Sequence, residues 1–345
     1  GHRKSQAELE AWLGKAHARD LWELAQEGKA TVRGLIERHE IECNLKAGLV
    51  NAAHNEEALK ALADETAHLN ASSGYSDVRM MDAAEIASHL STSIYPGGQF
   101  DAGGGHLHPL NYARGLASVA EKAGAQIFEH SRALHVEGGK VTCAQGTVTA
   151  DHILLACDAF TASVAPQLAP YIAHVESFMV ATAPLGEFLS RRLIPSDVAV
   201  ADTRHVLDYY RKSADGRLLF AGRESYFSVP KDVASIVRPR MVKVFPMLRD
   251  QPIEYAWSGT VGITRTRMPH FGRIGERVFF AHGYSGHGVA LATLGGKLLA
   301  EAAQGKSERF DVFAKVPAKK FPGGPLLRKP LVTAALLWYK LQDAM

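Results

Sequence analysis

A glycine-rich loop near the C-terminal end of the chain limits most strongly what this sequence can fold into. The apolar run Val278 to Ala281 has the composition of a buried strand, and a helical pattern follows from about His287 to Ala303. Between them stands Gly283-Tyr284-Ser285-Gly286-His287-Gly288. A helix N-terminus leaves backbone N–H groups unpaired and carries a partial positive charge, and glycines let a ligand approach the backbone closely. The segment therefore predicts an α/β fold with a site for an anion or an electron-rich ring edge.

The loop alone does not identify its ligand. Its spacing is G-x-x-G-x-G rather than the G-x-G-x-x-G of dinucleotide-binding folds, and such glycine patterns also occur in turns that bind nothing. No G-x-G-x-x-G occurs early in the chain, and no phosphate-binding P-loop occurs anywhere. A nicotinamide- or ATP-dependent enzyme is therefore unsupported by a direct motif. If the loop binds a ligand, we expect the first amides of its helix to point into the largest pocket.

Two kinds of pattern alternate along the chain. Helix and strand patterns follow one another from Pro109 to Ala156 and again after Val278, whereas Tyr171 to Thr264 consists mainly of extended runs. This order predicts a mixed α/β fold, in which an antiparallel-sheet domain is inserted into a Rossmann-like domain. We expect residues 1–46, 109–165 and 256–345 to form the first domain, and residues 47–108 and 166–255 the second.

Composition excludes several classes of protein. Of the 345 residues, 46% are hydrophobic and 22% charged, which is typical of a globular protein, and a net charge of +3 gives no argument for a nucleic-acid partner. The three cysteines have no metal or redox spacing, so we expect no disulfide framework and no zinc site, and reduced thiols favour a cytoplasmic protein. No apolar run is long enough to span a bilayer, so no transmembrane segment is expected.

Further motifs accompany the loop, and they carry a resemblance in combination. They are Gly104-Gly105-His106-Leu107-His108-Pro109-Leu110-Asn111, Leu207-Asp208-Tyr209-Tyr210-Arg211, Trp257-Ser258-Gly259, Arg267-Met268-Pro269-His270-Phe271-Gly272-Arg273 and Phe321-Pro322-Gly323-Gly324. The sequence resembles the FAD-dependent D-amino-acid and glycine oxidase family, and within it the branch of the γ-glutamylputrescine oxidoreductases. The resemblance covers essentially the whole chain. It implies FAD as the cofactor and the oxidation of the CH–NH group of an amine.

The resemblance also implies a segment that this sequence does not contain. In the family, a βαβ unit with G-x-G-x-x-G comes first and binds the pyrophosphate and ribose of FAD. We expect such a unit before Gly1, so that the Rossmann-like domain of this chain is incomplete. The strands at Ile153–Ala156 and Val278–Ala281 would then lack a neighbour, and we expect residues 1–345 alone to hold little FAD.

The same resemblance places FAD against three parts of the chain. The turn at Gly286–Gly288 would lie at the pyrimidine end of the flavin, where a helix N-terminus stabilises the negative charge of the reduced ring. Ala156 and Cys157 match the end of a second cofactor strand, and Ala133 matches the position whose backbone meets the adenine. Ordinary core packing is the alternative for these residues. The predicted cofactor-binding residues are Ala133, Ala156, Cys157, Gly283, Tyr284, Ser285, Gly286, His287, Gly288 and Val289.

Candidate catalytic residues come from the inserted sheet and from the loop. Tyr209 and Tyr210 are neighbours on a strand, so only one of them can face a pocket. Trp257 either walls the pocket or packs in the core. His287 either donates a hydrogen bond to the cofactor or faces solvent in the turn. We predict catalytic roles for Tyr209, Trp257 and His287, and a substrate-binding role for Tyr210.

Further substrate-binding candidates are charged or titratable. Arg265 and Arg267 share strand parity and would meet a carboxylate such as a γ-glutamyl group, whereas solvated arginines are the alternative. His106 and His108 share one face at i, i+2. A metal pair has this spacing, but no third ligand is evident, so pocket-lining or structural histidines are preferred and no metal is expected.

The sequence supports three hypotheses of function. The first is an FAD-dependent oxidoreductase that converts γ-glutamylputrescine, or a close conjugate, to an aldehyde and ammonia and passes electrons to oxygen or another acceptor. The second is the same chemistry on glycine, sarcosine or a D-amino acid, as an oxidase or a dehydrogenase. The third is a chain that binds no flavin and acts as a partner or scaffold.

Overall fold

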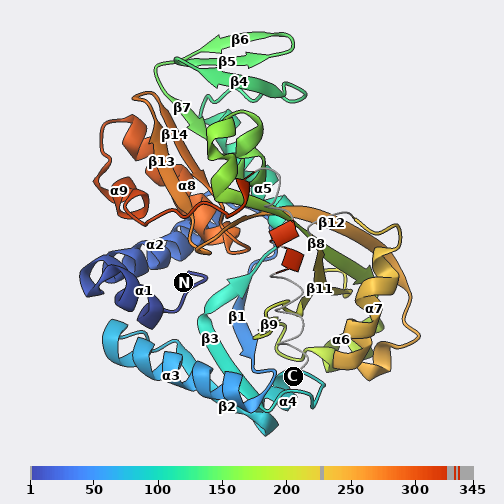
Figure 1. Cartoon of the computed structure of the whole chain (residues 1–345). Coiled ribbons are helices and arrows are strands. Elements are labelled where there is room, and N and C mark those ends of the chain that lie inside the picture. The colour runs from blue at the N-terminus through green and yellow to red at the C-terminus, as the bar shows by residue number, and fades with distance from the viewer. Residues whose placement is uncertain (1, 226–228, 325–329, 332, 335–345) are drawn as a thin grey trace. The chain divides into compact units, whose positions relative to one another are not determined.

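A computed structural model describes residues 2–225, 229–324, 330–331 and 333–334 (Figure 1). The chain divides into two compact units, and each is described by itself. In the described part, unit 1 comprises the residues up to Cys43, Pro109–Val175 and residues 260–324. Unit 2 comprises Asn44–His108, Glu176–Gly259 apart from residues 226–228, and residues 330–331 and 333–334. The mixed α/β class predicted from the sequence is confirmed.

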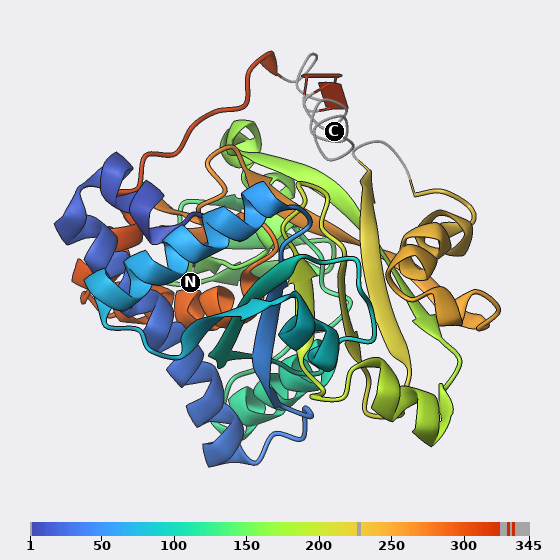
Figure 2. The same cartoon turned by 90° about the horizontal axis from the view of Figure 1, so that it is seen from below.

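The helices of unit 1 pack around a shared apolar cluster. α2 (Lys15–His39) lies along α8 (Gly288–Ala303) (Figure 2). The two backbones come close at Gly28, where an added Cβ would lie 3.1 Å from the carbonyl oxygen of Ala290. Leu21 and Leu294 are fully buried in this cluster. The other helices of unit 1 are α1 (Gln6–Leu13), α5 (Pro109–Lys122), α9 (Glu308–Ala314) and the 3-10 helices η1 (Asp158–Ser163) and η2 (Pro166–Tyr171).

Two small sheets complete unit 1 within the described residues. The first has the order β13 (His270–Ile274), β14 (Val278–His282), β7 (Ile153–Leu155), with β14 antiparallel to β13 and parallel to β7. The second is the antiparallel sheet of β4 (Ala133–Glu137), β5 (Lys140–Cys143) and β6 (Gly146–Thr149) (Figure 1). In the described part of the chain, β14 is paired on both sides whereas β7 is an edge strand, and Leu154 of β7 is 40% exposed.

Most of unit 2 is one large sheet. Its strand order among the described residues is β12-β8-β11-β10-β9-β1-β3-β2. Of the neighbouring pairs whose register is known, β1 and β9 are parallel and the others are antiparallel. The first residues of β8 and the last of β12 belong to unit 1. The strands are β1 (Lys46–Ala52), β2 (Val78–Asp82), β3 (Gly97–His106), β8 (Ile172–Thr182), β9 (Ala199–Asp202), β10 (Tyr209–Lys212), β11 (Leu218–Ser225) and β12 (Ile253–Thr264).

One face of this sheet carries the core of unit 2. Side chains alternate between the two faces along each strand, and Val180, Val200 and Phe220 point toward this core. α7 (Val233–Val244) lies beside β11 and adds Val237 and Met241 to the core (Figure 1). The alternation follows from the period of two along a strand, which leaves the other face to different side chains. The remaining helices of unit 2 are α3 (Glu56–Ser73), α4 (Ala83–His89), α6 (Gly186–Leu193) and the 3-10 helix η3 (Pro246–Leu248). Among the described residues, no helix combines the length and apolar composition that crossing a bilayer requires.

Candidate cofactor site

The glycine loop connects β14 to α8, as the sequence predicts. β14 ends at His282, His287 is the N-cap of α8, and the helix begins at Gly288. Gly283, Ser285 and Gly286 have positive φ angles of 74°, 53° and 90°. Left-handed backbone of this kind is easy for glycine and strained for most other residues, which explains two of the glycines. The loop therefore turns sharply and delivers a helix N-terminus at the end of a buried strand.

The first half of the loop is anchored inside unit 1. Ser285 donates its backbone N–H to Gly262 O at 3.1 Å, and its hydroxyl accepts the backbone N–H of Thr264 at 3.3 Å. The same hydroxyl donates to Gly283 O at 3.1 Å. Tyr284 is 9% exposed and packs edge-to-face on Phe271. These contacts attach the loop to the end of β12, so Tyr284 and Ser285 support the loop rather than present their side chains to a ligand.

The second half of the loop is accessible. Gly286, His287 and Val289 are exposed, and Gly288 is half-buried. A Cβ added at Gly286 would meet no atom within 4 Å, and one added at Gly288 would meet only the Tyr284 Cβ, at 3.9 Å. The first backbone N–H groups of α8 lie in this open segment and have no partner within the helix. The residues present therefore fit a cofactor that places an anionic or electron-rich edge on the start of α8.

Asp158 joins this site, and the sequence patterns did not assign it a role. Its Oδ1 accepts the backbone N–H of Gly283 at 2.8 Å and that of Tyr284 at 3.4 Å, and its Oδ2 accepts the N–H of Gly262 at 3.1 Å. Its own φ is 40°. Asp158 directly follows Ala156 and Cys157, which the resemblance assigns to a cofactor strand end, but no local signal shows that its carboxylate reaches a loop 125 residues away.

Ala156 and Cys157 lie at the same end of the sheet as the loop. β7 and β14 are parallel neighbours with Leu155 opposite Phe280, so the residues after both strands emerge at one edge. Ligands of open α/β sheets bind at such carboxyl ends. Both residues are exposed. Ala133 instead begins β4 in the separate small sheet and packs against its apolar cluster. The structure thus brings Ala156 and Cys157 beside the loop, whereas no recorded contact joins Ala133 to it, and all these assignments stay predictions.

The two tyrosines of β10 point to opposite faces of the large sheet, as strand alternation requires. Tyr210 is 3% exposed and lies in the core of unit 2, stacked on Phe220 with ring centroids 5.3 Å apart. Tyr209 lies on the other face, where its hydroxyl is 2.7 Å from Ser177 Oγ, and burial raises its pKa. Only Tyr209 is placed to meet a ligand on the face opposite the core. A substrate-binding role for Tyr210 stays a prediction that its burial disfavours.

The motif around these tyrosines also contains a structural anchor. Asp208 is 2% exposed, and its carboxylate accepts from Arg240 of α7 at 2.9 Å and 2.7 Å. A Cβ added at Gly222 of the neighbouring strand β11 would lie 2.2 Å from Asp208 Oδ1. The carboxylate therefore fits only because residue 222 is glycine. Part of the motif from Leu207 to Arg211 therefore holds the sheet to α7, independently of any ligand.

The expectation that Arg265 and Arg267 share strand parity is wrong. β12 ends at Thr264, whose Oγ1 donates to Met268 O at 2.7 Å and closes a turn. Arg267 has a φ of 64° in this turn, and Arg265 is exposed and donates to Lys320 O. The alternation along the strand does not extend past Thr264, so it cannot align the two side chains. Their contact with a substrate carboxylate stays a prediction.

The two histidines of the upstream motif are not equivalent. β3 ends at His106, so His108 lies beyond the strand whose period put both on one face, and that expectation is wrong. His106 is 8% exposed, its Nε2 bonds to Asp197 O at 2.8 Å, and burial lowers its pKa. Trp257, in β12, is 42% exposed, so it is not a core residue. In the part of the chain that the structure describes, no group of three His, Cys, Asp or Glu residues is placed to hold a metal ion.

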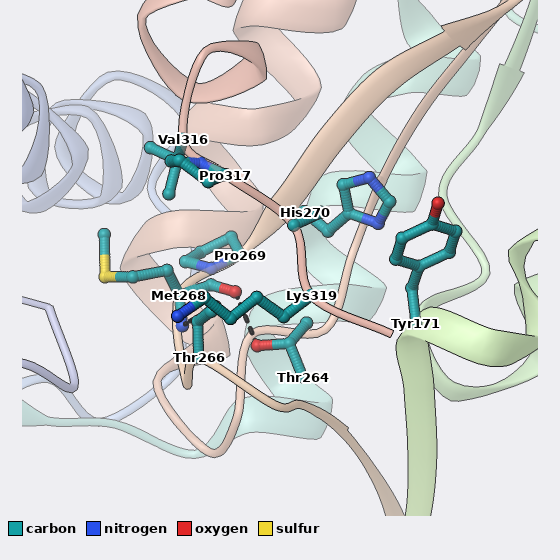
Figure 3. A pocket seen from close by; sticks show the side chains of 10 residues that line it. Tyr171, Thr264, Thr266, Met268, Pro269, His270, Val316, Pro317 and Lys319 are labelled. Atoms are coloured by element: carbon teal, nitrogen blue, oxygen red, sulfur yellow. Dashed lines mark hydrogen bonds between the residues drawn. The ribbon is translucent and has the colours of Figure 1, made fainter. Parts of the chain in front are cut away.

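A small cavity in unit 1 is lined by Tyr171 and His270, by residues just after β12 and by the segment that follows α9 (Figure 3). Figure 3 shows the ring of His270 next to that of Tyr171, with centroids 4.9 Å apart. His270 Nδ1 is 3.0 Å from Nε2 of the fully buried His282. Burial lowers the pKa of His270 to about 4, and burial together with the charge of a protonated His270 lowers the pKa of His282 to about 3. Both rings are therefore neutral near pH 7, and one of them donates its ring N–H to the other.

The expectation that the amides of α8 point into the largest pocket stays a prediction, and the loop lines neither of the two hollows described. A hollow of about 1050 Å³ in unit 1 is lined by residues 135–139 of β4 and the turn after it, by η2 and by the turn between β13 and β14. Neither this hollow nor the cavity near His270 is lined by a residue of Gly283–Gly288. The accessible half of the loop lies on an open surface, where an added Cβ at Gly286 meets no atom within 4 Å.

Comparison with known proteins defines the class of this protein. The chain belongs to the DAO family of FAD-dependent oxidoreductases, whose family model matches residues 3–302. The protein is therefore an FAD-dependent enzyme, and the resemblance found in the sequence motifs is confirmed.

Individual relatives show which members of the family this chain is similar to in sequence. The chain is 36% identical to the γ-glutamylputrescine oxidoreductase of Escherichia coli, over 98% of this chain and 80% of that protein. It is 37% identical to a probable oxidoreductase, OrdL, of Haemophilus influenzae, over 96% of this chain and 78% of that protein. The crystal structure of glycine oxidase from Geobacillus kaustophilus superposes with a TM-score of 0.71 at 21% identity and covers 85% of this chain and 79% of that chain. The last similarity shows the fold alone.

Proposed function

We propose that this protein oxidises the CH–NH group of γ-glutamylputrescine, or of a close polyamine conjugate, and releases an aldehyde and ammonia. The observation that supports this substrate is the 36% identity to γ-glutamylputrescine oxidoreductase over nearly the whole chain. Electrons then pass to oxygen or to another acceptor. The free thiols of Cys43, Cys143 and Cys157 agree with the cytoplasmic location that we propose for this enzyme.

The cofactor would be held at the start of α8. Gly286, His287, Gly288 and Val289 form the accessible face of the loop, and the unpaired N–H groups behind them favour the negative charge that a reduced flavin ring carries. Bound FAD would supply the capacity to accept a hydride from the amine carbon. His287 adds a donor at the N-cap, and Ala156 and Cys157 border the site from the parallel strand β7.

The substrate side is proposed to include Tyr209 and Trp257. The hydroxyl of Tyr209 is fixed by Ser177, which leaves its orientation defined before a substrate binds. Because burial raises its pKa, Tyr209 stays protonated and can donate a hydrogen bond, but it does not act as a base near neutral pH. The neutral amine must therefore reach the site as the minor form present in solution or lose its proton to another group. Hydrolysis of the resulting imine gives the aldehyde and ammonia.

A substrate panel tests the proposal. Purified protein supplemented with FAD would be given γ-glutamylputrescine, putrescine, glycine, sarcosine and D-alanine, with oxygen uptake and reduction of an artificial dye measured in parallel. We expect the highest kcat/KM with γ-glutamylputrescine. Preference for glycine or sarcosine would support the second hypothesis instead. Complete protein that includes the expected upstream βαβ unit and still takes up no FAD, as judged from its visible absorbance, would support the hypothesis of a scaffold without flavin.

A further inference from the structure

Asp158 occupies a backbone position that few side chains tolerate. It is the third residue after β7 and opens η1, and its φ of 40° lies in the left-handed region. Aspartate, asparagine and glycine are the residues that enter this region most readily. A strained position of this kind is retained only where surrounding contacts determine it.

The contacts of Asp158 come from two other segments of unit 1. Three backbone N–H groups converge on its carboxylate, from Gly262 near the end of β12 and from Gly283 and Tyr284 in the loop. A Cβ added at Gly262 would lie 2.8 Å from Asp158 Oδ2 and 3.0 Å from the backbone nitrogen of Ala159. The close approach that the carboxylate requires is thus possible only because residue 262 is glycine.

The carboxylate acts on the anchored half of the loop and leaves the accessible half open. Hydrogen bonds from N–H groups to an ionised acceptor are about twice as strong as those between neutral groups. They fix the directions of the Gly283 and Tyr284 peptides, and the chain then reaches His287, whose N–H closes on Tyr284 O at 3.0 Å. The orientation of the first turn of α8 therefore depends on the side chain of Asp158, which comes after a different strand, β7.

We propose that Asp158 is the positioning residue of the cofactor loop, holding Gly283–Gly288 in the shape that directs the start of α8 toward FAD. This inference rests on the proposed cofactor site. The proposal makes a specific prediction for FAD binding. Loss of the Asp158 carboxylate lets the loop relax, so FAD must reorder the loop on binding and binds more weakly.

Three variants separate the carboxylate from the backbone conformation. Asp158→Gly permits the positive φ and removes all three acceptor contacts, whereas Asp158→Asn keeps the conformation and one acceptor oxygen but turns a donor toward an N–H group. Asp151→Gly, at an exposed position shortly before β7, is the matched control. Each purified protein would be titrated with FAD by fluorescence, and the thermal midpoint would be measured without FAD.

We expect Asp158→Gly to weaken FAD binding about tenfold or more, Asp158→Asn to weaken it less, and Asp151→Gly to leave it unchanged. The visible spectrum of the flavin bound to Asp158→Gly should also shift, because its environment at the start of α8 changes. A purely structural role would lower the thermal midpoint but leave the FAD dissociation constant of the folded protein within about twofold of the wild type, and that result would overturn the proposal.

The experiment gives a different result if FAD does not bind at the start of α8 at all. Gly288→Val places a side chain in the accessible half of the loop without requiring a left-handed φ, because Gly288 is not among the residues with positive φ. If Gly288→Val binds FAD as well as the wild type does, the start of α8 is not the flavin site. If Gly288→Val loses FAD and both Asp158 variants keep it, the site stands and the role of Asp158 is wrong.

Discussion

The buried pair His270 and His282 should make the stability of this protein fall steeply in mild acid. Both rings have folded-state pKa values, about 4 and about 3, that lie below the ordinary histidine value of 6.5. In the unfolded chain the same rings bind protons once the pH falls below 6.5. The unfolded state therefore binds more protons than the folded state between pH 6.5 and about 4, and the free energy of unfolding decreases as the pH falls through this window.

The size of the effect follows from the same pKa values. At about pH 5, roughly 1.5 pH units below the ordinary pKa, a histidine that stays neutral in the folded protein destabilises it by about 2 kcal/mol relative to neutral pH. The two histidines together then contribute about 4 kcal/mol, a large part of the stability of an ordinary domain. Because the rings touch, the second proton binds less readily than the first, and the pair must be considered as one titrating unit.

Urea unfolding at several pH values, followed by circular dichroism, measures this quantity. His282→Gln removes one titrating ring and retains a polar group beside His270, and His39→Gln, at an exposed position at the end of α2, is the control. We expect the wild type and His39→Gln to lose stability in parallel from pH 7.5 to pH 5, and His282→Gln to lose about 2 kcal/mol less. Equal losses in all three proteins would refute the idea that burial keeps His282 neutral.

Three pairs of substitutions test other parts of the structure. Gly288→Val should lower the flavin content of the purified protein, while Gly296→Ala, on the exposed side of α8, should retain it and stabilise the helix by about 0.5–1 kcal/mol; flavin absorbance and thermal midpoints measure both. Tyr209→Phe should lower kcat/KM for the amine without changing the thermal midpoint, whereas Tyr210→Phe should leave both unchanged, because its hydroxyl has only a 3.4 Å contact with Tyr95 among the contacts described; steady-state kinetics would show whether the roles are reversed. Gly28→Val should destabilise unit 1 by about 1–3 kcal/mol, since its side chain would meet the backbone of α8, and a thermal midpoint equal to that of Gly28→Ala would contradict this close packing.

Local patterns predict the loop and the fold class but not the contacts that hold the loop. The glycine spacing and the apolar strand before it are adjacent in sequence, so they predict a strand, a turn and a helix at Val278–Ala303. Asp158 meets the same loop from far away in sequence and through a positive φ, and neither property has a local signature.

The errors at the site have a related cause. The pairing of Arg265 with Arg267 extends the alternation of a strand, but β12 ends at Thr264, three residues before Arg267, where Thr264 bonds to Met268. Strand parity did predict that Tyr209 and Tyr210 face opposite ways, since that rule needs only the residues of β10 itself.

The opposite orientation of Tyr209 and Tyr210 limits how this enzyme can change during evolution. A deletion or insertion of one residue in β10 would turn the core tyrosine outward and drive its neighbour into the apolar cluster of Phe220 and Phe245. Such a change would alter substrate contacts and fold stability at once. New substrate preferences on this sheet should therefore arise by replacement at alternate positions of unchanged length, and related enzymes with different substrates should keep the spacing from β10 to β11.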